Sequence, residues 1–156
     1  MSIRSNSLRA ASMVAAGCVA VSLAVPVFGV AASMPATTHG RATVRSIIFP
    51  PLAGKLLATS GRHVLYAFSR NTLTKTHCSA VCARTWKPLL TAGQPIAAKG
   101  SGVQPTLLGT ISLGSGRYQV VYKGHALYTY AKDYAGQANG ELKHEFGGVW
   151  HAVDLQ

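Results

Sequence analysis

The chain has 156 residues, enough for one ordinary domain with a hydrophobic core. Hydrophobic residues make up 48% of the sequence, which argues against a disordered chain. Fifteen Lys and Arg face only four Asp and Glu, a formal net charge of +11 that favours anionic partners. The basic residues are scattered and no nucleic-acid-binding motif accompanies them, so we expect no specific nucleic-acid binding.

The N-terminal segment has the features of a secretory signal. Arg4 and Arg9 precede an apolar stretch at 10–32, which ends in the small residues Val30-Ala31-Ala32. A basic start, an apolar centre and a small-residue exit predict a signal peptide over 1–32. The protein is therefore expected in the periplasm, at the cell surface or outside the cell. Removal of the signal peptide leaves thirteen basic residues against four acidic ones. The resulting net charge of +9 favours an anionic envelope component as partner.

Two alternatives to simple cleavage remain open. The apolar stretch is long enough to span a membrane if it stays uncleaved. Cys18 follows Ala15-Ala16-Gly17, which loosely resembles the site at which bacterial lipoproteins are acylated. We expect membrane contact only in these two cases. Residues 33–43, which include Pro35 and Gly40, are expected to form a flexible leader.

Strand patterns dominate the predicted domain, residues 44–156. The segment 44–49 is rich in β-branched residues, and Pro50-Pro51 cannot continue a central strand. Segments 55–59 and 63–69 flank a short turn around a glycine, which predicts a β-hairpin.

The rest of the chain alternates between turn-forming and strand-forming segments. Residues 94–104 contain Pro and Gly and are expected to be a loop, and 78–86 is the one segment with a helical pattern. Two glycine-containing turns predict a three-stranded meander, and a closing strand follows a glycine-rich stretch. These four strands are expected at 110–113, 117–122, 125–131 and 149–155.

Two segments of the chain resemble each other. Residues 62–71 match residues 124–133, and each copy is followed by a tryptophan, Trp86 or Trp150. We therefore predict a mainly β fold: a small antiparallel sheet domain built from two pseudo-repeats, with one short helical turn around Cys78–Trp86. The two repeat units are expected at about 54–90 and 109–155.

Aromatic side chains recur at alternate positions in both copies. Tyr66 and Phe68 share one face of a strand, as do Tyr128 and Tyr130, because side chains alternate along a strand. We expect these pairs to form an aromatic core where the two halves meet. The alternative is an exposed aromatic strip that binds a ligand.

The polar residue that ends each copy differs. Asp133 follows the second aromatic strand, and Asn71 takes the same position after the first. Asp and Asn commonly bind backbone N–H groups two residues further on, so we expect a structural turn at both positions.

The motif Tyr-x-aromatic-x-x-Asp at 128–133 resembles the secreted repeat family of predicted bacterial lipoproteins. Asn71 in the first copy departs from the aspartate of that family. The resemblance implies export, often with a lipid anchor, and no established enzymatic activity. Further pieces that fit the family pattern, within 54–153, are 65–68, 78–82, 86–89, 119–122 and 136–150.

Cys78 and Cys82 are the cysteines of the predicted domain. In an oxidising compartment they are expected to form a disulfide that closes one turn and leads into Trp86. The alternative is a metal site in which His77 joins the two thiolates, a ligand set that suits copper(I) or zinc. A further ligand would then come from one of four other histidines, namely His63, His125, His144 and His151.

Catalysis has little support in the sequence. All four acidic residues lie in the C-terminal quarter, and no serine has the context of an activated nucleophile. We therefore expect no catalytic residue and no cofactor. The leading hypothesis is an exported, non-catalytic binding or structural module of unknown ligand. The alternative is a periplasmic copper or redox accessory protein that uses Cys78 and Cys82 with His77.

Overall fold

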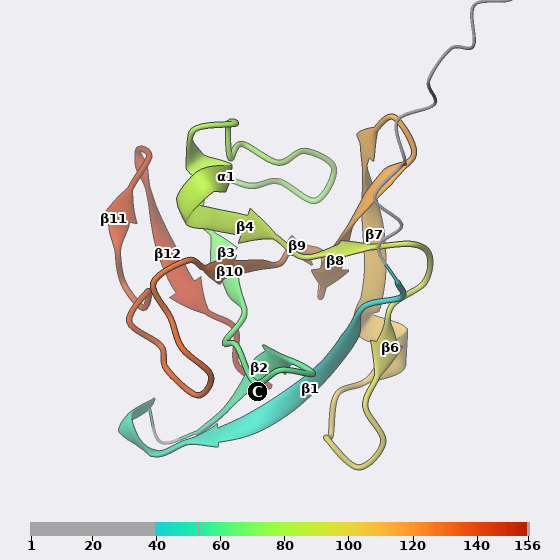
Figure 1. Ribbon diagram of the computed structural model, residues 1–156, viewed down its shortest axis with the longest axis vertical. Coiled ribbons are helices and arrows are strands. Elements are labelled where there is room, and N and C mark those ends of the chain that lie inside the picture. Colours follow the sequence, from blue (N-terminus) through green and yellow to red (C-terminus); the bar gives the residue numbers. More distant parts are fainter. Residues whose placement is uncertain (1–39, 53, 156) are drawn as a thin grey trace, which may run out of the picture. The chain divides into compact units, whose positions relative to one another are not determined.

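The computed structural model describes residues 40–52 and 54–155, so the predicted signal peptide and Cys18 lie outside the described residues. Figure 1 shows a mainly β fold, which confirms the predicted class. Every strand pairing in the described part is antiparallel except that of β1 with β6. The helical elements there are α1 (Cys82–Thr85), η1 (Pro50–Leu52) and η2 (Pro105–Leu107).

The strands of the described part form three small sheets. The first has the order β2 (Gly54–Thr59), β1 (Thr43–Phe49) and β6 (Ile96–Ala97). The second has the order β11 (His144–Glu145), β12 (Gly148–Ala152), β3 (Tyr66–Phe68), β10 (Tyr128–Tyr130) and β4 (Trp86–Pro88). The third has the order β5 (Leu90–Thr91), β8 (Arg117–Tyr122) and β7 (Leu108–Gly114), and β9 (His125–Ala126) also pairs with β8.

The predicted hairpin at 55–69 forms only at its tip. The Thr59 N–H donates to the His63 carbonyl, and Ala58 and Val64 form a single antiparallel bridge. Beyond this point β2 pairs with β1, whereas β3 pairs with β12 and β10. β2 and β3 separate because Tyr66 and Phe68 of β3 are buried, and a strand in the interior needs hydrogen-bonding partners on both edges.

The meander prediction is confirmed for β7, β8 and β9, but the third predicted strand breaks at Leu127. Leu127 is buried in one hydrophobic cluster, while its neighbours Ala126 and Tyr128 pack in another. This change of side sends β10 into the second sheet, where Tyr128 pairs with Tyr66.

Two other predictions need correction. The segment 94–104 is not entirely loop, because Ile96–Ala97 pairs in parallel with the free edge of β1. A strand of two residues is too short to leave a periodic pattern in the sequence. The helical segment is also shorter than 78–86: α1 covers Cys82–Thr85, and Trp86 begins β4 because it pairs with Tyr130.

Equivalent hydrogen bonds link the sheets in the two halves of the chain. The Leu65 N–H donates to the Leu57 carbonyl, and the Leu127 N–H donates to the Val120 carbonyl. The Leu65 carbonyl in turn accepts from Val153, as the Leu127 carbonyl accepts from Leu89. The two segments thus share this hydrogen-bond pattern, while a fold built from two pseudo-repeats stays a prediction.

Candidate binding site

A stack of aromatic rings occupies the centre of the second sheet. Trp86 and Trp150 are fully buried, and their rings are parallel with centroids 3.9 Å apart. Phe68 stacks on Trp150 at 4.3 Å, and Tyr130 lies 4.5 Å from Trp86. The motif aromatics are therefore core residues, and they present no aromatic strip to a ligand.

The polar residue after each aromatic strand binds the tyrosine of the other copy. The Tyr66 hydroxyl donates to Asp133 Oδ2 at 2.5 Å, and Asn71 Nδ2 donates to the Tyr128 hydroxyl at 3.0 Å. Asp133 Oδ1 accepts the Asn139 N–H, and Asn71 Oδ1 accepts the His77 N–H, in each case six residues further on. A separation of six residues between the acceptor and the N–H donor differs from the expected turn, in which the separation is two residues. Either Asp or Asn can occupy this position, because each has one atom that bonds the distant tyrosine and one oxygen that accepts a nearby backbone N–H.

The Tyr66–Asp133 pair makes the free energy of unfolding depend on pH in the alkaline range. Burial raises the pKa of Tyr66 far above its ordinary value, and the hydrogen bond to the Asp133 carboxylate raises it further. Because the folded-state pKa lies above the unfolded value, the stabilisation is complete below about pH 10 and falls as pH rises beyond it. We expect the free energy of unfolding, measured with urea, to decline above pH 10 in the native chain. The decline should be shallower in Tyr66→Phe, and an equal decline in both would contradict this explanation.

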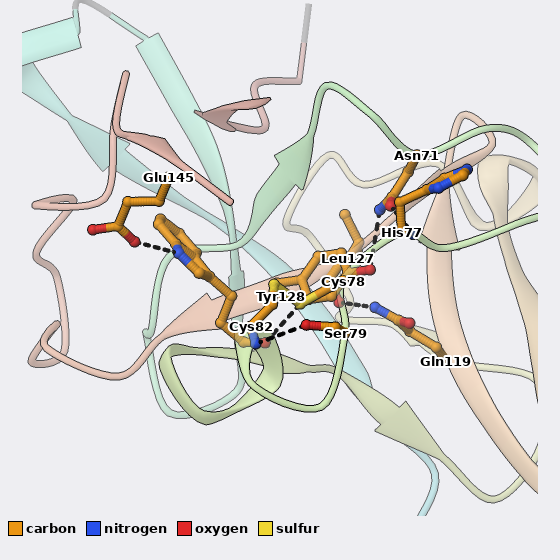
Figure 2. The surroundings of a disulfide bond; sticks show 10 residues. Asn71, His77, Cys78, Ser79, Cys82, Gln119, Leu127, Tyr128 and Glu145 are labelled. Carbon is orange, nitrogen blue, oxygen red and sulfur yellow. Dashed lines mark hydrogen bonds between the residues drawn. A yellow bond between two sulfur atoms is a disulfide. The ribbon is translucent and has the colours of Figure 1, made fainter. Parts of the chain in front are cut away.

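Cys78 and Cys82 form a disulfide at the entrance to α1, with their Cα atoms 5.2 Å apart. Figure 2 shows the bond beside Ser79, whose Oγ accepts the Cys82 N–H at 3.4 Å. Cys78 Sγ lies 3.9 Å from the Trp86 carbonyl oxygen. The bond therefore fixes the turn that leads into the buried Trp86.

The metal alternative at His77, Cys78 and Cys82 requires the reduced protein, since sulfur atoms in a disulfide are not thiolates. Among the described residues, no three His, Cys, Asp or Glu side chains lie close enough to hold a metal ion. His77 is exposed, and its backbone N–H donates to Asn71.

Reduction of the disulfide is expected to lower the free energy of unfolding by about 2 kcal/mol, because the closed loop is very short. Urea unfolding of the native chain with and without a reductant measures the difference. The double variant Cys78→Ser with Cys82→Ser serves as control, since the reductant should leave it unchanged. A reduced chain as stable as the oxidised one would show that the turn is held by other contacts.

Most of the acidic side chains are bound inside the domain. Glu145 Oε2 accepts the Trp86 Nε1–H at 2.8 Å (Figure 2), and Glu141 Oε2 accepts the Ala152 N–H. With Asp133 bound to Tyr66, Asp154 is the one acidic residue left without such a bond in the described part. By contrast, twelve of the thirteen Lys and Arg side chains are exposed, Lys143 being half-buried. The outer surface is therefore strongly positive.

The structure contains a cleft of about 340 Å³ beside β3 and β12. It brings together His125 and His151, two of the histidines considered as ligands from the sequence, whereas His63 does not line it. Lys123 and Asp154 also border the cleft, and His151 Nδ1 lies 4.0 Å from Glu141 Oε1 outside it. Its lining is thus of mixed charge.

Three residues that stabilise the fold were not predicted from the sequence, namely Gln119, Gly140 and Glu145. Gln119 is fully buried, and its Nε2 donates to the Leu127 carbonyl at 2.8 Å (Figure 2). Its one signal is a polar side chain in the middle of a predicted apolar strand, where it needs a backbone partner. Gly140 and Glu145 leave no signal, because their partner Trp86 is distant in sequence.

The fold and the site define a small, basic, mainly antiparallel β module with one local disulfide. Residues 109–154 match the model of a family described as a secreted repeat of unknown function. The match confirms the resemblance for these residues, and the description indicates an exported protein. Neither curated proteins nor solved structures gave a match. Within residues 40–52 and 54–155 there is no helix of the length and hydrophobicity needed to cross a membrane.

Proposed function

We propose that this protein is a non-catalytic binding module of the cell envelope or its surroundings, and that its partner is an anionic envelope component. The observation that carries the proposal is the separation of charge. Carboxylates of the domain turn inward to Tyr66, Trp86 and the Ala152 backbone, while the cations stay at the surface. Thirteen cations, nearly all exposed, against four acids give the domain a positive field that attracts polyanions.

The chemistry of the buried groups also supports a role without catalysis. Asp133 is buried and already accepts hydrogen bonds from Tyr66 and Asn139. A general base must lie within reach of a substrate proton, and this carboxylate is buried with a hydrogen bond on each oxygen. The motif residue that the two copies share in position therefore stabilises the fold rather than a reaction.

Co-sedimentation with envelope fragments of the organism that makes the protein tests the proposal. We expect the native chain to sediment with intact fragments, to be released by salt, and to stay in solution when the anionic polymers have been extracted from the fragments. Equal sedimentation with extracted fragments, or release that does not depend on salt, would contradict an anionic partner.

A further inference from the structure

A second pocket, of about 450 Å³, lies next to the disulfide, and the charged residues in its lining are both cationic. Two arginines border it from different parts of the chain: Arg84 from α1, and Arg117 from the start of β8. Their neighbours in the pocket are small or apolar, and none is acidic; they are Cys78, Ser79, Ala80, Ala83 and Leu113.

Both guanidinium groups are available to a ligand. In the part of the chain that the structure describes, the side chains of Arg84 and Arg117 form no hydrogen bond or ion pair. Arg41 and Arg70, in contrast, donate to the carbonyls of Gln94 and Gly147. Two unpaired cations beside one cavity repel each other, so an anion between them would be stabilised by both.

From these features we infer that the pocket lined by Arg84, Arg117 and Ser79 binds the phosphate group of a small phosphorylated sugar or polyol. A guanidinium offers a planar fork of N–H donors, and phosphate has oxygens on several sides, so it can accept two such forks at once. A carboxylate has two oxygens, which a single fork already occupies. Ser79 Oγ accepts the Cys82 N–H, so its own O–H is left to donate to a third phosphate oxygen.

The size of the pocket sets the rest of the ligand. A volume of 450 Å³ lies within the usual range for small-molecule sites and exceeds what a phosphate ion alone would fill. Cys78 of the disulfide lines the cavity together with Ser79 and Ala80. The inference rests on the proposed function, because it gives the anionic partner a chemical group and a place on the domain.

Titration of the ¹⁵N-labelled native chain with glycerol 3-phosphate tests the inference. We expect saturable amide shifts at Ser79, Ala80, Ala83 and Arg117, and much weaker shifts with gluconate, a carboxylate of similar size. Arg84→Gln and Arg117→Gln should each weaken binding about tenfold or more, which corresponds to one charged hydrogen bond. Arg45→Gln is the matched control, because Arg45 is exposed on β1 and borders neither pocket.

Several results would overturn the inference. These are shifts spread over the whole surface, gluconate binding as tightly as glycerol 3-phosphate, equal weakening in Arg45→Gln, or binding to phosphatidylglycerol vesicles with none to the soluble phosphate. Both pocket arginines are exposed, so unchanged spectra of the free variants will show that the fold is intact. If native and pocket-variant chains sediment equally with envelope fragments, only this inference fails. If the native chain does not sediment with intact fragments, the proposed function fails.

Discussion

Replacing Trp86 by alanine is expected to lower the free energy of unfolding by about 4 kcal/mol, the range for a buried tryptophan. Trp86 is fully buried, stacks on Trp150 at 3.9 Å and meets the edge of Tyr66 at 5.3 Å. The substitution opens a cavity and also removes the Nε1–H that Glu145 accepts. Urea unfolding followed by circular dichroism measures the loss, with Tyr128 and Trp150 still reporting on the remaining core.

Tyr134→Ala is the matched control for this prediction, because the Tyr134 side chain is 77% exposed. We expect its effect to stay within about 0.5 kcal/mol. If Trp86→Ala cost as little as the control, the aromatic stack would not be the structural centre of the domain. A loss of about 4 kcal/mol is a large fraction of the roughly 5–15 kcal/mol by which folded domains are generally stable.

The second large effect is expected at Gly140, where there is no room for a side chain. A Cβ at this position would lie 2.7 Å from Trp86 Cη2 and 2.9 Å from Tyr66 Cζ. Both rings are held from other sides, Tyr66 by its bond to Asp133, so neither can move away. We expect Gly140→Ala to lower the free energy of unfolding by about 3 kcal/mol, the upper range for overpacking.

Gly40→Ala is the control for this substitution. Gly40 is exposed, and a Cβ there would meet no atom within 4 Å. The control should change the free energy of unfolding by less than about 0.5 kcal/mol. Two variants of equal stability would mean that Gly140 does not pack tightly against Trp86 and Tyr66.

The sequence predicts local elements well in this domain. The strand at Thr43–Phe49 and the glycine turns of the meander appear as expected, because β-branched runs and Gly-Ser-Gly act over a few residues. The predicted aromatic faces also meet, since alternation fixes the side on which Tyr66 and Phe68 lie.

Contacts between residues far apart in the chain could not be predicted from the sequence. The break at Leu127 arises because two cores form on opposite sides of the chain, a fact that periodicity over seven residues does not contain. The pairing of Trp86 with Glu145, and the shared pocket of Arg84 and Arg117, join residues far apart in the chain. An isolated arginine looks the same in the sequence whether it faces solvent or a cavity.

The placement of the acidic side chains also depends on contacts between residues far apart in the chain. The four acidic residues lie in the C-terminal quarter of the sequence, which does not show what their side chains contact. The structure binds three of them internally, to Tyr66, Trp86 and the Ala152 backbone. These tertiary contacts engage three of the four acids, whereas nearly all of the cations stay exposed.

The most direct test of the central claim, an exported module that binds an anionic partner, is the affinity of the native chain for polyphosphate as a function of salt, with dextran as the neutral polymer. We expect binding to polyphosphate alone, with affinity falling about tenfold or more between about 0.05 M and 0.2 M salt, because Lys and Arg side chains displace counterions from the polyanion. Equal binding to dextran, or affinity that does not change with salt, would contradict it.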